Sequence, residues 1–180
     1  MKRTSHGLTL LELLTAVAVL ATVAAVALPA WSRTTAAAHA ASARSALARA
    51  VLDSVRHAGL RGTEVVLCPS AEGATCLDSN DWSHGWIAFA DGDGDRAPDP
   101  HEARLLHEAA MHADVHVQST TGRRRVVFQP GGGNAGSNVT FTVCDRRGAS
   151  HATTLVLANS GQMRQGVANP RQAASCLAGL

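Results

Sequence analysis

The chain opens with a sharp change from polar to apolar positions. Residues 1–7 are polar and carry two positive charges, whereas residues 8–28 form a 21-residue apolar run interrupted by Thr9, Glu12, Thr15 and Thr22. About 20 consecutive apolar residues cross the hydrocarbon core of a bilayer as a helix. The pattern predicts a transmembrane helix over 8–28, with the basic leader on the cytoplasmic side and the remainder of the chain outside.

Two other classes of segment compete with this interpretation. A secretory signal peptide has a shorter apolar stretch, about 7–15 residues, and then a small-residue cleavage site; Ala27 and Ala30 flank Pro29 and leave such a site open. The other alternative is an ordinary single-span anchor. Glu12 argues against both the signal peptide and the single-span anchor, because an unpaired carboxylate within an apolar helix costs about 2–3 kcal/mol. It indicates a helix that packs beside others, where the free N-terminal amine of a neighbouring subunit can pair with it once the leader has gone.

The helical pattern continues beyond the apolar run. Pro29 lacks a backbone donor, so we expect it to kink the helix or open one turn. Residues 31–58 are rich in alanine and carry one apolar stripe at helical spacing, formed by Leu47, Val51, Val55 and Ala58. Gly59 and Gly62 predict the end of the helix. Residues 29–62 are therefore expected to be an amphipathic continuation that lays this stripe on a folded domain.

From residue 63 the pattern changes to short β-like runs separated by turn residues. The expected strands are 64–68, 86–90, 115–118, 125–129, 139–144, 153–158 and 162–164. The predicted fold class is α+β, in which a long N-terminal helix packs on an antiparallel β-sheet built from residues 63–180. No Ser/His/Asp or Cys/His arrangement in the sequence indicates catalysis, so we do not expect an enzyme.

The four cysteines add a prediction about the compartment. An even number beyond a membrane anchor indicates an oxidising compartment and two disulfides. Sequence leaves all three possible pairings open. We favour Cys68–Cys76 and Cys144–Cys176, because the members of each pair share a terminal region of the exported domain.

The N-terminal residues carry a resemblance to a known processing signal. Residues Gly7-Leu8-Thr9-Leu10-Leu11-Glu12 resemble the type IV prepilin cleavage motif. The resemblance implies that a membrane aspartyl peptidase cuts between Gly7 and Leu8 and methylates the new N-terminus at Leu8. Glu12 is then the fifth mature residue. Leu8 stands where the family usually has Phe.

The exported domain resembles the GspH/FimT family of minor pilins and pseudopilins. The matching segments are Val66-Leu67-Cys68-Pro69-Ser70, Cys76, Trp82, Gly85-Trp86-Ile87-Ala88-Phe89, the acidic loop from Asp91, Val127-Phe128-Gln129-Pro130-Gly131, Phe141-Thr142-Val143-Cys144 and Asn159-Ser160-Gly161-Gln162-Met163-Arg164. The resemblance implies a type IV pilin-like fold and a structural subunit of a type II secretion pseudopilus or a type IV pilus.

The same resemblance implies where the protein works and with what. Its partners would be other pilin or pseudopilin subunits, the prepilin peptidase and the inner membrane. The protein would cross that membrane once, keep its C-terminal domain in the periplasm, and join a periplasmic or surface filament. No cofactor is expected, apart from the calcium considered next.

An acidic loop offers a candidate metal site. Counted from Asp91, carboxylates occupy positions 1, 3, 5, 9 and 12, which is the spacing of oxygen ligands in an EF-hand loop; the residues are Asp91, Asp93, Asp95, Asp99 and Glu102. However, Arg96 stands where the EF-hand has Gly, and Pro98 replaces its usual apolar residue. We favour a solvated acidic loop, with Ca²⁺ as the alternative.

Charge divides the exported domain into two halves. Residues 64–114 hold eleven acids and two arginines, a formal charge of −9, whereas residues 119–180 hold seven arginines and one acid, a formal charge of +6. The seven are Arg123, Arg124, Arg125, Arg146, Arg147, Arg164 and Arg171. Arginine-rich surfaces suit the phosphate backbone of nucleic acids, and FimT-type minor pilins bind DNA during natural transformation. The alternative function is therefore a DNA-binding minor pilin that acts in DNA uptake.

Two features qualify the nucleic-acid and metal alternatives. The FimT-type Gly-Arg-x-Arg element is represented here by Gly161-Gln162-Met163-Arg164, without its first arginine, and the arginines could instead pair with the acidic half or with neighbouring subunits. His112 and His116 are four residues apart, as zinc ligands on a helix would be, but Val115 and Val117 favour a strand there. We therefore expect no zinc site from the set His101, His107, His112 and His116.

Overall fold

The computed structural model describes residues 9–135 and 138–180. The chain divides into two compact units that meet between Thr35 and Ala36, and the long helix α1 (Leu10–Arg61) contributes to both. The N-terminal unit is the apolar part of α1. The C-terminal unit, residues 36–180, contains the rest of α1 and all the strands of the described residues.

Helix α1 begins and ends at residues that stabilise its termini. The Thr9 hydroxyl accepts a hydrogen bond from the Glu12 amide at 3.2 Å and caps the first turn. The helix continues through Pro29 and Gly59 without a break, so neither the expected open turn nor the expected stop at Gly59 is observed. Gly62, in a left-handed conformation (φ 68°), donates its amide to the Ala58 carbonyl at 3.0 Å and ends the helix.

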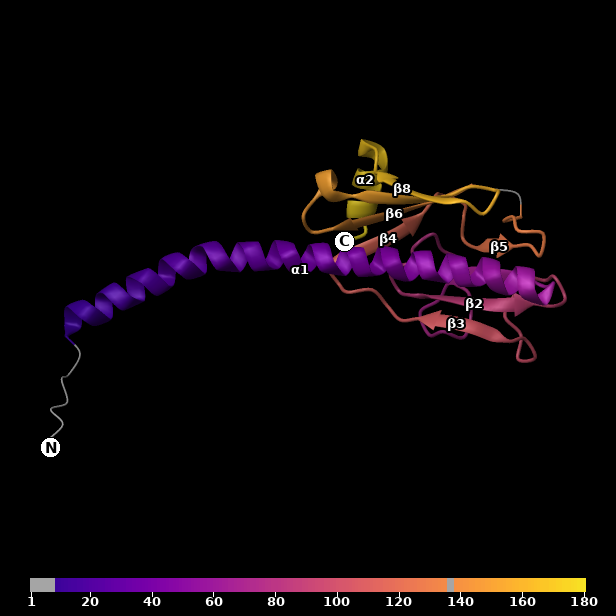
Figure 1. Ribbon diagram of the computed structural model, residues 1–180, viewed down its shortest axis with the longest axis horizontal. Coiled ribbons are helices and arrows are strands. Elements are labelled where there is room, and N and C mark those ends of the chain that lie inside the picture. Colours follow the sequence, from indigo (N-terminus) through magenta and orange to yellow (C-terminus); the bar gives the residue numbers. More distant parts are fainter. Residues whose placement is uncertain (1–8, 136–137) are drawn as a thin grey trace, which may run out of the picture. The chain divides into compact units, whose positions relative to one another are not determined.

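The strands of the C-terminal unit form two antiparallel four-stranded sheets (Figure 1). The first has the order β3-β2-β1-β5, with β1 Glu64–Pro69, β2 Trp86–Asp91, β3 Arg104–Glu108 and β5 Val126–Phe128. The second has the order β4-β6-β7-β8, with β4 Val115–Ser119, β6 Val139–Asp145, β7 Thr153–Leu157 and β8 Met163–Val167. A short 3₁₀ helix, η1 (Ala149–His151), and the helix α2 (Pro170–Leu177) complete the unit.

One core joins the C-terminal part of α1 to both sheets. The buried face of the helix is mostly alanine, and its members are Ala36, Ala40, Ala43, Ala46, Leu47, Ala50, Val51, Ser54 and Ala58. It packs in one cluster with Leu67 and Trp86 of the first sheet and with Phe141 and Leu155 of the second. The expected stripe is confirmed: Leu47, Val51 and Ala58 are buried, and Val55 packs against them half-buried. The small side chains of the helix leave room for the large side chains of the sheets, such as Trp86 and Phe141.

The opposite face of each sheet is covered by a segment that a disulfide fastens. Val66, Ile87 and Phe89 of the first sheet form a second cluster with Cys68, which is bonded to Cys76. Ala152 and Ala173 form a third cluster around Cys144 of β6, which is bonded to Cys176 of α2. These are the two pairings favoured from the sequence. Because both faces are covered, nearly every residue of β1 and β6 is buried, and buried and exposed residues do not alternate along these strands.

The architecture agrees with the predicted fold class, but three elements differ from expectation. The sheet is divided in two, and neither β3 nor α2 was among the predicted elements. β3 lies at an edge and is largely exposed, so its sequence has no clear alternation. α2 has eight residues with little apolar content, although its start is encoded by a capping box between Asn169 and Gln172 followed by Pro170.

Leu47→Ala tests the dependence of the fold on the helix face. Leu47 is fully buried between helix and sheets, and loss of a buried leucine side chain costs about 2–5 kcal/mol. We expect the free energy of unfolding in urea to fall by that amount. Leu52, on the same helix but 60% exposed, provides the control: Leu52→Ala should change stability by less than about 0.5 kcal/mol. Equal losses in both variants would contradict the assigned face.

Candidate functional site

The N-terminal unit is an apolar helix whose side chains have no cover within the described chain. It is the one helix there that is long and apolar enough to cross a membrane, and the side chains of its apolar window are not buried. The exposure is similar at both ends of the stretch, since Leu11 is 72% exposed and Val26 is 73% exposed. The hydroxyls of Thr15 and Thr22 donate to backbone oxygens one turn earlier, at 3.0 and 2.8 Å. Their polar groups are thus already satisfied in apolar surroundings.

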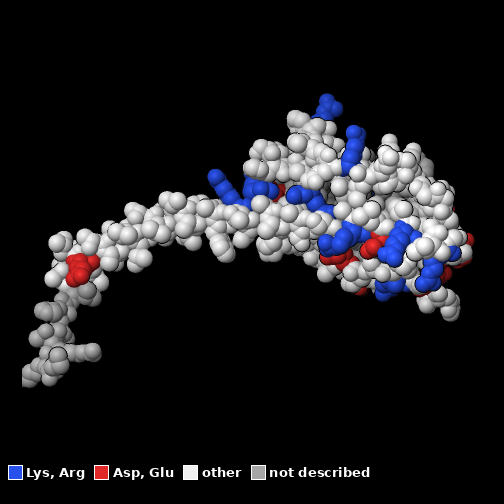
Figure 2. All heavy atoms as spheres, in the orientation of Figure 1, with Lys and Arg blue, Asp and Glu red and all other residues white. Residues whose placement is uncertain are grey.

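Glu12 is the acidic residue in the first turn of this helix. Figure 2 shows the apolar stretch as white atoms apart from one acidic group near its start. A carboxylate near a helix N-terminus is favoured by the helix dipole, which lessens the cost of placing it among apolar residues. Gly7 and Leu8, the expected cleavage residues, lie outside the described residues, so cleavage and methylation there stay predictions.

The acidic loop between β2 and β3 uses its carboxylates to hold its own backbone. Asp91, Asp93 and Asp95 accept the amides of Gly94, Asp95 and Ala97 at 2.9, 3.2 and 2.7 Å. Glu102 accepts the amides of Gly92 and Asp99 at 2.7 and 3.2 Å.

Of the five expected calcium ligands, the loop brings three together. Asp91, Asp93 and Asp95 each place an oxygen within 4.8 Å of the others. Asp91 is buried, and its Oδ2 has no hydrogen-bond partner among residues 9–135 and 138–180. Arg96 adopts the left-handed conformation (φ 62°) that glycine provides in an EF-hand. Calcium binding stays an untested alternative to the solvated loop favoured from the sequence.

The seven candidate DNA-binding arginines do not form one surface. Arg123, Arg124 and Arg125 line a hollow of about 330 Å³ together with Arg96 and Asp78. Arg124 pairs with Asp78, and Arg125 donates to the Arg96 carbonyl at 2.8 Å. Arg164 on β8 and Arg171 on α2 are exposed elsewhere. Figure 2 accordingly shows several separate basic groups on the visible face, some of them beside acidic atoms.

Arg147 is engaged inside the unit. Its Nε and Nη2 donate to the two carboxylate oxygens of Asp145 at 2.9 and 2.7 Å, and the Asp145 side chain is 1% exposed. Burial alone would raise the pKa of Asp145, but the hydrogen bonds from Arg147 outweigh it and hold the pKa below its ordinary value. Arg147 is thereby committed to the fold, and its neighbour Arg146 lies 3.8 Å from the buried carboxylate of Asp114.

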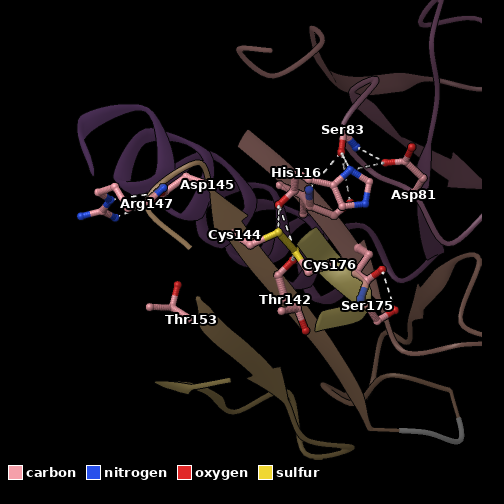
Figure 3. Close-up of a disulfide and its surroundings, with 12 residues drawn as sticks. Asp81, Ser83, His116, Thr142, Cys144, Asp145, Arg147, Thr153, Ser175 and Cys176 are labelled. Carbon is pink, nitrogen blue, oxygen red and sulfur yellow. Dashed lines mark hydrogen bonds and ion pairs between the residues drawn. A yellow bond between two sulfur atoms is a disulfide. The ribbon is translucent and has the colours of Figure 1, made fainter. Parts of the chain in front are cut away.

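His116 lies beside the Cys144–Cys176 disulfide, with Ser83 and Asp81 on its other side (Figure 3). The Ser83 hydroxyl accepts the Val117 amide at 2.9 Å and contacts His116 Nδ1 at 2.7 Å, while an Asp81 oxygen lies 3.7 Å from the same Nδ1. Burial lowers the pKa of His116 and so favours the neutral form of the ring. Sequence inspection did not find this grouping, because its residues are 33 positions apart.

This grouping differs from a nucleophilic triad. In a triad the serine and the carboxylate contact opposite nitrogens of the imidazole, so that a proton can pass through the ring. Here both contact Nδ1, and Nε2 faces the chain end, where a side chain at Gly179 would come within 2.4 Å of it. The grouping fastens the segment 81–83 to β4.

The comparisons with known proteins decide the family. Residues 35–161 match the family described as type II transport protein GspH, and residues 2–28 match the prokaryotic N-terminal methylation motif. The chain belongs to the GspH family. It is a subunit of the minor pilin and pseudopilin class, and membership implies association with other pilin subunits. Together with the exposed apolar helix, the methylation motif indicates a membrane-anchored pilin.

Solved structures agree on the fold. The type IV minor pilin FimU of Pseudomonas aeruginosa matches in two crystal forms, with TM-scores of 0.54 and 0.50 at 15% and 13% identity; both matches cover 74% of this chain, and 89% and 90% of that one. The minor pseudopilin EpsH from the type 2 secretion system of Vibrio cholerae gives a TM-score of 0.48 at 10% identity, covering 70% and 94%. A search of curated proteins gives no significant match. The FimU likeness confirms the type IV pilin-like fold.

In this GspH-family chain the Gly-Trp-Ile-Ala-Phe segment has a structural role. Gly85 has φ 103°, and a side chain there would come within 2.3 Å of the Glu108 carbonyl. Glycine is therefore required where β2 enters beside β3. The next residue, Trp86, is fully buried in the core shared with α1.

Arg147→Met tests the buried ion pair. Removing one partner leaves an uncompensated buried charge, so we expect the free energy of unfolding at pH 7 to fall by about 3 kcal/mol. A carboxyl whose pKa is lowered on folding stabilises the fold above its ordinary pKa of about 3.9 and loses that contribution as pH falls through its folded value. The difference between variant and wild type should thus shrink on acidification to about pH 3. Arg171→Met removes an exposed arginine and should leave urea unfolding curves unchanged; a pH-independent difference for Arg147→Met would contradict the assignment.

Proposed function

We propose that this protein is made as a precursor, cut between Gly7 and Leu8 by a prepilin peptidase, methylated at Leu8 and assembled through α1 into a type II secretion pseudopilus or a type IV pilus. The apolar part of α1 crosses the inner membrane before assembly, and residues 63–180 lie in the periplasm. The observation that carries the proposal is a fully exposed apolar helix with one carboxylate in its first turn.

The exposure of the helix supports assembly over simple anchoring. An apolar surface of this length must be covered either by lipid or by other helices. Lipid alone leaves the Glu12 carboxylate unpaired in an apolar medium, at a cost of about 2–3 kcal/mol. In a bundle of like helices, the amine freed by cleavage before Leu8 on one subunit can pair with Glu12 of the next. The carboxylate that destabilises an isolated anchor then stabilises a bundle. The ion pair also fixes how far neighbouring helices are shifted along the bundle axis.

The Glu12→Gln variant separates processing from assembly, because we expect it to affect only assembly. We expect the mature N-terminus at a methylated Leu8 in both the wild type and the variant, by mass spectrometry of the protein isolated from membranes. Co-isolation of the tagged variant with the other pilin-like subunits of its cell should fall by about tenfold or more, because a neutral amide cannot form the ion pair.

Glu64→Gln, which changes a carboxylate at the start of β1 instead, should co-isolate like the wild type. An N-terminus near Ala30 would show that the segment is a signal peptide. Normal co-isolation of Glu12→Gln would contradict the assembly role while leaving processing intact.

A second candidate is the binding of DNA by the exported domain, as an uptake subunit would require. One observation favours it: four arginines and one acidic residue, Asp78, line the same hollow, and an excess of arginine suits a phosphate backbone. The arginines are Arg96, Arg123, Arg124 and Arg125. Arg146 and Arg147 contribute less, because they lie against buried carboxylates. The secretion or pilus subunit remains the primary proposal.

A mobility-shift assay with the unit 36–180 tests this candidate. We expect salt-sensitive binding to double-stranded DNA that the variant Arg123→Ala/Arg125→Ala weakens, with the slope of log affinity against log salt reduced by about 2. Arg56→Ala, which removes an exposed arginine from α1, should bind like the wild type. Absence of salt-sensitive binding by the wild type would exclude the candidate.

A further inference from the structure

Three side chains that sequence analysis did not group converge within the C-terminal unit. His39 comes from α1, and His112 and Asp114 come from the connection between β3 and β4. Nδ1 of His39 lies 3.0 and 3.1 Å from the two oxygens of Asp114, and Nδ1 of His112 lies 2.6 Å from Oδ1. The two imidazole rings are stacked, with centroids 3.8 Å apart and planes inclined by 23°.

We propose that His39, His112 and Asp114 form a binding site for a transition-metal ion of the Zn²⁺ class. The three ligand atoms lie within 4.8 Å of one another. Around tetrahedral zinc, with bonds of about 2.0–2.2 Å, ligand atoms are separated by about 3.3–3.6 Å. One ion among these atoms would replace the two N–H protons that now point at the carboxylate, once the stacked rings turn their Nδ1 atoms towards it.

The donor set selects the class of metal. Two imidazole nitrogens with one carboxylate suit Zn²⁺, Co²⁺, Ni²⁺ or Cu²⁺, whereas Ca²⁺ and Mg²⁺ prefer oxygen alone. The site is thus chemically different from the all-carboxylate loop at Asp91, Asp93 and Asp95. With three protein ligands, water would occupy the remaining coordination position.

Burial and access fit a bound ion. The Asp114 side chain is 5% exposed and held in place, whereas the His112 side chain is 57% exposed and open to solvent. Beside the cluster is a hollow of about 160 Å³ lined by His39, His112, Met111 and the acidic Glu108. Arg146, 3.8 Å from Asp114 Oδ2, opposes a cation, but it is 62% exposed and can turn towards water.

An ion bound here would connect elements far apart in the sequence. His39 and Asp114 are 75 positions apart, so coordination would fasten α1 to the β3–β4 connection beside the core. A ligand that binds only the folded state stabilises it. The bound ion would therefore stabilise the attachment of α1 to the rest of the unit, in the part of the helix that packs against both sheets.

Zinc titration of the untagged full-length chain in detergent micelles tests the proposal. By calorimetry, we expect one Zn²⁺ per chain, and Co²⁺ should give the visible absorption of a nitrogen- and oxygen-ligated ion. His112→Gln and Asp114→Asn should each weaken zinc affinity by at least about tenfold, since even the loss of an outer-shell partner costs about 10–100-fold. Zn²⁺ should raise the unfolding temperature of the wild type but not that of His112→Gln.

His101→Gln is the matched control, because it removes an exposed histidine outside the cluster; it should bind zinc like the wild type. His112 is exposed, so His112→Gln is expected to fold even if Asp114→Asn does not. The proposal is overturned if the wild type binds no Zn²⁺, if His112→Gln binds it with unchanged affinity, or if Ca²⁺ displaces Zn²⁺ at equal concentration.

Discussion

The contact between the alanine-rich face of α1 and both sheets is the interaction on which the C-terminal unit depends. The two sheets are separate hydrogen-bonded ladders, and their inner faces meet in one cluster that includes the helix. Alanine at 36, 40, 43, 46 and 50 keeps the helix surface narrow, so Trp82, Trp86 and Phe141 can fill the space beside it. The Trp82 ring lies against both Trp86 and Phe141. These three rings supply much of the bulk of the core in a sequence with only 3% aromatic residues.

The same arrangement explains the two disulfides. Since α1 covers one face of each sheet, the opposite faces need cover of their own, and neither the 68–76 loop nor the eight-residue α2 buries much apolar surface. Covalent bonds between Cys68 and Cys76 and between Cys144 and Cys176 hold these small covers in place. A disulfide adds stability to a segment that buries too little apolar surface to stay packed by itself.

Sequence predicted the features that short-range patterns encode. The apolar run with Glu12, the stripe ending at Ala58 and most strands follow from periodicity, and the helix-on-sheet fold follows from their order. β3 was missed because an edge strand needs no alternating pattern, and the division into two sheets depends on pairings that no local signal contains. The histidines show the same limit: His112 and His116 are neighbours in sequence, yet one meets His39 and the other meets Ser83. Likewise, adjacent Arg146 and Arg147 face different carboxylates.

The Cys144–Cys176 bond has a further topological consequence. It joins β6 to α2 across 32 positions, so the chain between them, with η1, β7 and β8, forms a closed covalent ring. A single peptide-bond cut anywhere within this ring would leave both fragments linked through the sulfur atoms. One proteolytic cut in the exposed turns of this region would therefore not release the C-terminal end of the subunit.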